Sequence, residues 1–205
     1  RGFMVQTDSS LFIDIEKIQN ETNVSSNVVS IICKRLNRLH ANVRAVLVYA
    51  AYLGFHFGID ELKAIVISEH EDVSPILPRS DVGNDGITSR IEAQQYHEMV
   101  DRILHAATAE GIIEKCDDAG IKMKFVHDYL QTVLYDSIPE GEERAMIHSR
   151  IGKRIRETML PKSNDFLFAI VYHLNHASSC LEEVNDLVEL SRLNLSAAKL
   201  AISEK

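Results

Sequence analysis

Several residue types are scarce in this chain, and each shortage excludes a class of protein. Its 205 residues include only 3 Cys, 4 Pro and 9 Gly, too few for a disulfide scaffold, a collagen-like repeat or a flexible linker. No apolar run approaches the roughly 20 residues that a membrane-spanning helix needs, and no positively charged signal peptide opens the sequence. We therefore expect a helix-rich chain that makes no contact with a membrane.

Positive charge is also in short supply. The 22 Lys and Arg stand against 30 Asp and Glu, which gives a formal net charge of −8 and disfavours a nucleic-acid surface as the main function. The cysteines Cys33, Cys116 and Cys180 are odd in number and far apart, a pattern typical of small buried apolar side chains in a reducing compartment. We expect a cytoplasmic location.

The residues that are present suffice for a folded core. Hydrophobic residues make up 45% of the chain and charged residues 25%, which excludes disorder, and the length suits one large domain or two small ones. Because the sequence opens with Arg1 and stops within a helical pattern, we expect a piece of a longer protein, with part of the function outside it.

The first 138 residues combine short helices with two pairs of strands. Alternating apolar residues predict β-hairpins within residues 1–15 and 112–125. N-cap residues and apolar spacing predict helices at residues 26–39, at 42–54, from Asp60 onward, and at 91–111. We expect Gly54 to stop its helix in the left-handed conformation and Asp60 to cap the next one. This order of elements is typical of a winged-helix domain, mainly α with short β-hairpins.

The rest of the chain divides into an insertion and a helical domain. Residues 68–90 are acidic, contain two prolines and two glycines, and show no sustained period, so we interpret them as an exposed loop or insertion. Residues 139–205 are helical in pattern throughout, with Pro139 and Pro161 at the predicted breaks. This second region is predicted to be a helical domain of the helix-hairpin or TPR-like type.

Signatures of catalysis are missing. A phosphate-binding loop needs Gly-x-x-x-x-Gly-Lys-Ser/Thr, whereas the pair Gly152-Lys153 lies inside a predicted helix, with Arg154 after it and Ile147 in the first glycine position. Dinucleotide-binding, zinc-protease, serine-hydrolase and Cys-x-x-Cys patterns are absent as well. We assign this segment no catalytic residue and no metal site.

Two clusters in the helical region have both a structural and a functional interpretation. His173, His176 and Cys180 have a spacing that suits zinc, but no further ligand stands nearby, and two histidines at a helix C-terminus also favour the dipole. A basic run is either the solvated face of a helix or a surface for a protein partner: it consists of Arg144, Arg150, Lys153, Arg154 and Arg156.

A winged helix also raises the possibility of DNA binding, because the helix before the wing often enters the major groove. Here that helix carries Glu98, Asp101 and Glu110, and the predicted wing tip adds Asp117 and Asp118. A phosphate-facing surface should be basic, so we do not expect nucleic acid as a partner.

The pair His127-Asp128 closes the second predicted hairpin and opens the helix that follows it. Asp128 as the helix N-cap is the structural interpretation. A histidine at such a junction can also direct a ring nitrogen toward a phosphate, and a helix N-terminus favours bound anions.

Several stretches of the chain have a familiar wording and order. They are SNVVSIICKRLNRL (Ser26–Leu39), Val46–Phe57, FVHDYLQ (Phe125–Gln131), Ile138–Glu140, HSRIGK (His148–Lys153), LFAIVYHLN (Leu167–Asn175) and LSRLNL (Leu190–Leu195). Together they resemble the winged-helix and helical region that follows the ATPase core in STAND-type, AAA-like P-loop NTPases of multidomain signalling proteins. The resemblance covers nearly the whole chain except the first ten residues and the insertion.

The resemblance implies a regulatory role. In that family the winged helix folds over the bound nucleotide, and the histidine of a His-Asp pair contacts the β-phosphate of ADP. It implies that His127 senses the phosphate with Asp128 as its support, and that Gln131, Tyr135 and Arg150 contribute. ATP or ADP would be bound mainly by an upstream P-loop core and coupled to a downstream signalling domain, such as a kinase or cyclase. The alternatives are a nucleotide-independent protein-interaction scaffold and a DNA-binding regulator.

Overall fold

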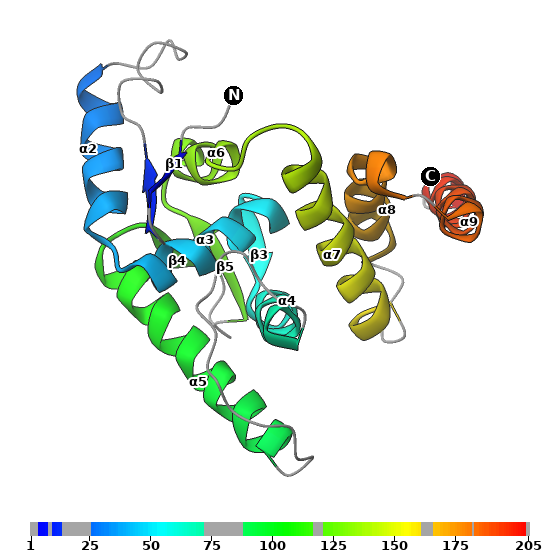
Figure 1. The fold of residues 1–205 in the computed structure, drawn as a ribbon, viewed down its shortest axis with the longest axis horizontal. Coiled ribbons are helices and arrows are strands. Elements are labelled where there is room, and N and C mark those ends of the chain that lie inside the picture. The colour runs from blue at the N-terminus through cyan, green and yellow to red at the C-terminus, as the bar shows by residue number, and fades with distance from the viewer. Residues whose placement is uncertain are drawn as a thin grey trace. The chain divides into compact units, whose positions relative to one another are not determined.

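A computed structural model of the chain describes residues 4–7, 10–13, 26–71, 88–116, 121–160, 166–181 and 183–203. These residues are mainly helical and include a small antiparallel sheet of three strands, so the predicted mainly α class is confirmed (Figure 1). The chain divides into two compact units, Arg1–Pro139 and Glu140–Lys205.

Unit 1 contains both predicted strand pairs. Strand β1 pairs with β2, and β5 lies between β3 and β4, all antiparallel. The turns at residues 8–9 and 117–120 lie outside the described residues. The elements of this unit are β1 (Met4–Thr7), β2 (Ser10–Ile13), α2 (Ser26–Arg38), α3 (Ala41–Leu53), β3 (His56–Gly58), α4 (Ile59–Glu71), α5 (Thr88–Ala109), β4 (Ile113–Lys115), β5 (Lys122–Phe125) and α6 (Asp128–Asp136).

Helix α3 is the central helix of unit 1. Every residue from Val43 to Tyr52 is buried, and α4, α5 and α6 all pack against this helix. Gly54 ends it, as predicted, and has a positive φ of +125°, but its ψ of −174° is not that of the predicted left-handed helical conformation. That combination is open almost only to glycine, which explains why glycine stands there.

Arg44 is a charged residue inside this core. Its Nη1 donates hydrogen bonds to the carbonyl oxygens of Leu39 at 2.5 Å, Asn37 at 3.3 Å and Leu36 at 3.4 Å. The last carbonyls of a helix have no partner within the helix, so the guanidinium closes the C-terminal end of α2. Burial lowers the pKa of Arg44 below its ordinary value.

The predicted insertion is shorter than expected. Helix α4 continues to Glu71 and α5 begins at Thr88, so residues 68–71 and 88–90 are helical, while residues 72–87 lie outside the described part. Helix α4 also begins before Asp60, which therefore is not its cap. Instead, Glu61 Oε2 accepts a hydrogen bond from the Gly58 N–H at 3.4 Å, and burial raises the pKa of this carboxyl.

Unit 2 is helical, as its sequence predicts. Helix α8 packs against both α7 and α9, and the second contact is made by leucines and small residues: Leu167, Val171 and Ala197, with Leu160, Leu193 and Leu200 around them. The elements of the unit are α7 (Glu142–Thr158), α8 (Leu167–His176), the 3-10 turn η2 (Ser178–Cys180) and α9 (Val184–Ser203).

Gly152 brings α7 close to α8. A Cβ at this position would lie 2.8 Å from Leu174 Cδ2 and 3.2 Å from His173 Cβ, below ordinary van der Waals contact. The Gly-Lys pair of the sequence is therefore a packing feature inside a helix, and glycine is required here by the close approach of the second helix.

Replacing Gly152 with Ala should lower the free energy of unfolding by about 1 kcal/mol. Overpacking typically costs about 1–3 kcal/mol and outweighs the gain of up to about 1 kcal/mol in helix propensity. A double-mutant cycle with Leu174→Ala, followed by urea denaturation, checks the cause. In the Leu174→Ala background the alanine should become stabilising, and an equal cost in both backgrounds would contradict this packing explanation.

Candidate functional site

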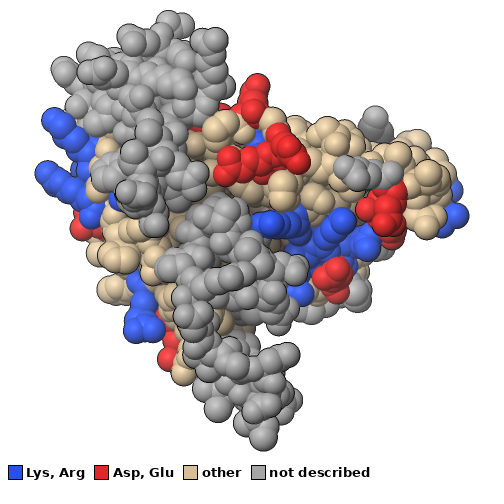
Figure 2. Space-filling view, in the orientation of Figure 1, with Lys and Arg blue, Asp and Glu red and all other residues tan. Residues whose placement is uncertain are grey.

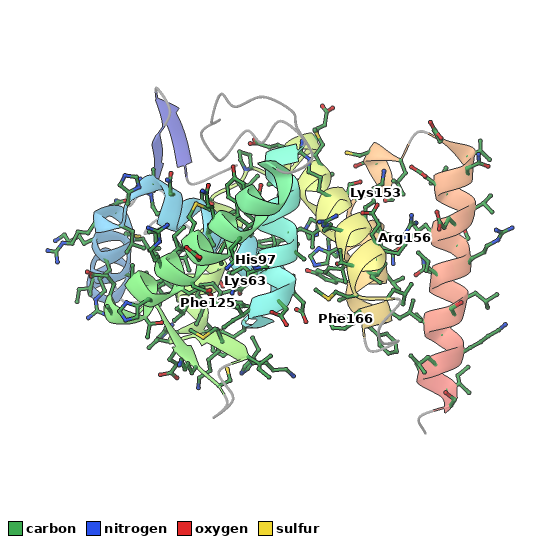
Figure 3. The ribbon with its side chains drawn as sticks, turned by 90° about the horizontal axis from the view of Figure 1, so that it is seen from below. Lys63, His97, Phe125, Lys153, Arg156 and Phe166 are labelled. Atoms are coloured by element: carbon green, nitrogen blue, oxygen red, sulfur yellow. The ribbon has the colours of Figure 1, made fainter. Side chains whose placement is uncertain are left out.

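The predicted site lies where the central strand of the sheet passes into a helix. Phe125, the last residue of β5, is fully buried, and its aromatic ring lies 5.7 Å from that of Phe57 (Figure 3). The chain then emerges to the surface, because the next three side chains, Val126 to Asp128, are all exposed. The core thus fixes the start of α6 and leaves the His-Asp pair accessible.

The geometry of the pair differs from the expected N-cap. His127 occupies the N-cap position, in extended backbone, and Asp128 is the first helical residue. Both side chains accept a hydrogen bond from the Tyr129 N–H, His127 Nδ1 at 3.1 Å and Asp128 Oδ1 at 2.7 Å. The prediction that Asp128 alone caps the helix is therefore wrong.

The two side chains also constrain where the imidazole proton lies. His127 Nδ1 is 2.8 Å from Asp128 Oδ1, but a ring nitrogen that accepts from Tyr129 cannot donate to a carboxylate at the same time. If Nδ1 accepts from Tyr129, the neutral ring carries its proton on Nε2. If Nδ1 donates to Asp128, the Tyr129 N–H bonds to Asp128 alone, and Nε2 is then a donor only when the ring carries both protons.

Helix α6 is held in place by two of the residues that the family resemblance singled out. Gln131 Nε2 donates to the Ala51 carbonyl oxygen at 2.9 Å, and the ring of Tyr135 lies 4.5 Å from that of Tyr52. Both contacts join α6 to α3, so these residues position the helix. Arg150 lies in α7 and is half-buried.

The histidines that suggested zinc form another arrangement. His173 is buried, and its Nδ1 lies 2.9 Å from Nδ1 of His148, a buried residue of α7. His176 stacks on His148 at 4.9 Å, while its Nδ1 lies 2.9 Å from the Tyr172 carbonyl oxygen. Among the described residues no three His, Cys, Asp or Glu side chains could hold a metal ion.

Sequence reasoning missed the buried pair because its members stand 25 residues apart. The available signal for a buried His148 was its place next to Ile147, on the apolar side of α7. Burial, together with the neighbouring histidines, lowers the pKa of His148 to about 4 and that of His173 to about 3. Two neutral rings fit the Nδ1–Nδ1 contact, since one donates and the other accepts.

The predicted basic face of α7 is largely paired within unit 2. Lys153 Nζ lies 3.6 Å from Asp186 Oδ2, and Arg156 Nη1 lies 2.8 Å from Glu189 Oε2, so both pairs join α7 to α9. Figure 3 shows Lys153 and Arg156 on the side of α7 that is turned toward α9. These two charges connect helices of the unit.

The charged side chains of unit 1 are relevant to the alternative that the chain binds DNA. Asp101 of α5 pairs with Lys63 at 2.6 Å, and Lys124 of β5 pairs with Glu114 at 2.9 Å, which raises the pKa of this lysine. Asp117 and Asp118, at the tip of the predicted wing, lie outside the described residues. Basic side chains project instead from α2, at the left edge in Figure 2: Lys34, Arg35 and Arg38 are exposed there.

The cysteines have different environments and are all free. Cys33 is buried, and burial raises the pKa of its thiol to about 11, as expected for an inert apolar residue. Cys116 is exposed and Cys180 half-buried, so the expectation that every cysteine is buried is wrong.

Comparisons with protein-family models, with curated proteins and with solved structures find no match for this chain. Among the helices in the described part of the chain, none has the length and apolar character needed to cross a membrane.

Proposed function

We propose that unit 1 is a winged-helix domain. The described elements from α3 to β5 run helix, strand, helix, helix, strand, strand, and the strand order is β3-β5-β4. This order, with β5 in the centre, is what supports the proposal. The segment from Lys115 to Lys122 would then be the wing, and α6 would follow directly from the wing's second strand.

This domain, together with the helical unit 2, would couple the ATP or ADP state of an upstream P-loop core to a signalling output such as protein kinase activity. The observation that carries the proposal is the exposure of His127, 52% for its side chain, at a helix N-terminus whose position the core fixes. With a proton on Nε2, the exposed ring would donate to an anion, and α6 adds its backbone dipole.

The energy of such a contact is sufficient for regulation. A charge-assisted hydrogen bond between imidazole and phosphate contributes about 1.5–3 kcal/mol, which is within the usual range of coupling between two sites in allosteric proteins. A contact made with ADP and lost with another nucleotide state would shift the balance between two conformations by that amount.

The test replaces His127 in the protein that carries the nucleotide-binding core. His127→Ala and His127→Asn should both speed the release of a fluorescent ADP by about tenfold or more and raise the basal output. Asparagine keeps a side-chain cap for α6, so only the alanine variant should also lose about 1 kcal/mol of stability.

His56→Ala serves as the matched control, because His56 is an exposed histidine of β3 in the same unit. It should leave ADP release unchanged. If ADP release and output in both His127 variants equal those of the parent protein, His127 has no part in nucleotide sensing.

A nucleotide-independent protein-interaction scaffold remains the second candidate. The specific observation that favours it is the group of exposed apolar residues on the last helix of unit 2. Binding of a protein partner that persists unchanged with ATP, with ADP and without nucleotide would support this second function over the first.

A further inference from the structure

Helix α9 has two opposite apolar faces, of which only one is covered. The inner face packs on α8, with Leu190 and Ala197 buried and Leu193 and Leu200 half-buried. Residues displaced by about half a turn lie on the outer face. Figure 3 shows side chains of α9 extending from the side turned away from Lys153 and Arg156.

The outer face has the residue spacing of a coiled coil. Six exposed residues follow one another at intervals of four and three along the whole helix, which is the repeat that keeps a seam facing a second helix. Their large apolar members are 44% to 74% exposed. We call this set the outer stripe: Val184, Val188, Ser191, Leu195, Ala198 and Ile202.

The acidic and the basic residues of α9 lie on different sides of the helix. Its acidic residues Asp186 and Glu189 make ion pairs with α7. Its basic residues Arg192 and Lys199 are exposed and each follows a member of the outer stripe directly. Within the described part of the chain, neither basic side chain forms an ion pair, so uncompensated positive charge lies along one side of the stripe.

We propose that the outer stripe binds an acidic amphipathic helix of a partner. Its apolar residues, at the same heptad spacing, would fill the seam between Val184 and Ile202. Its Asp or Glu residues would lie beside Arg192 and Lys199, where charges that flank a helical seam determine partner choice. This inference does not depend on nucleotide sensing by unit 1.

A second copy of the chain is a poorer occupant of the stripe. In an antiparallel pair of α9 helices, the positions of Arg192 and Lys199 would face the same positions of the other copy, which places like charges together. In a parallel pair they would face Leu187 and Asn194, which carry no negative charge. An acidic helix satisfies both the apolar spacing and the charge.

The experiment uses the whole 205-residue chain and two labelled three-heptad peptides with identical apolar seams. One peptide carries Glu at the positions that flank the seam, and the other carries Lys. Fluorescence anisotropy should show saturable binding of the Glu peptide, at least about tenfold tighter than binding of the Lys peptide at low salt. The double reversal Arg192→Glu and Lys199→Glu should exchange this preference.

Two variants distinguish binding at the outer stripe from nonspecific binding elsewhere on the protein. Leu195→Asp, at the centre of the stripe, should abolish binding, while Ile31→Asp, an equally exposed apolar residue of α2, should leave it unchanged. Absence of saturable binding, or equal affinity for both peptides, would overturn the proposal. So would a concentration-dependent dimer in sedimentation velocity that Leu195→Asp abolishes, since the occupant would then be a second copy.

Discussion

Lowering the pH from 7.5 to 5.5 should reduce the free energy of unfolding of the chain by about 3 kcal/mol through His148 and His173. In the unfolded chain each imidazole titrates near its ordinary pKa of about 6.5 and is about nine-tenths protonated at pH 5.5. In the folded chain both pKa values lie well below that, at about 4 and about 3. Each ring then contributes about 1.4 kcal/mol to the loss.

The sign of this pH dependence follows from which state, folded or unfolded, binds more protons. Because the folded pKa values are depressed, the unfolded state takes up protons first as the pH falls. The contribution of the two histidines is therefore complete above about pH 6.5 and declines from there toward the folded pKa values. Two charged rings cannot keep the 2.9 Å contact between their Nδ1 atoms, since neither would retain a lone pair to accept.

Urea denaturation at the two pH values measures the effect. His173→Gln removes one titrating ring but keeps a group that can hydrogen-bond to His148, so the pH-dependent loss should fall to about half. His105→Gln, at an exposed position of α5, should leave the loss unchanged. A loss equal in parent and His173→Gln would show that other groups cause the acid sensitivity.

Periodicity was sufficient to predict most of the described helices and strands, whereas the capping predictions at Gly54, Asp60 and Asp128 differ from the structure. Alternation predicted the hairpin that ends at Phe125, and the 3.6-residue period predicted the helices of unit 2, because one buried face leaves a regular pattern. Boundaries were less predictable: α4 runs on to Glu71, beyond the residue where apolar spacing stops, since helix propagation continues wherever the backbone allows it.

What the sequence could not reveal depends on contacts between distant segments. Arg44 is a charged residue that is buried in a helix, because its guanidinium bonds to three carbonyl groups at the end of α2. The pairing of His148 with His173 similarly requires the close approach of two helices at Gly152. The exposure of His127 could be anticipated from its place between a strand and a helix, whereas its role as the N-cap could not.

Replacing Phe125 with Ala should lower the free energy of unfolding of unit 1 by about 3–5 kcal/mol, the usual cost of removing a buried aromatic ring. Phe125 is fully buried, opposes Ile113 across the sheet, and its N–H donates to the Phe55 carbonyl oxygen at 3.1 Å. The backbone bonds would remain, so the loss reports the ring's contribution to the core. Chemical denaturation followed by circular dichroism provides the measurement.

Val126→Ala is the matched control, because Val126 is the next residue of the same segment and its side chain is exposed. It should change stability by no more than about 0.5 kcal/mol. Phe125→Leu should recover much of the loss, since leucine refills most of the space. If Phe125→Ala cost as little as the control, the core would not anchor the end of β5. The position of His127 would then have to be set by the contacts of α6 with α3, which Gln131→Ala would weaken.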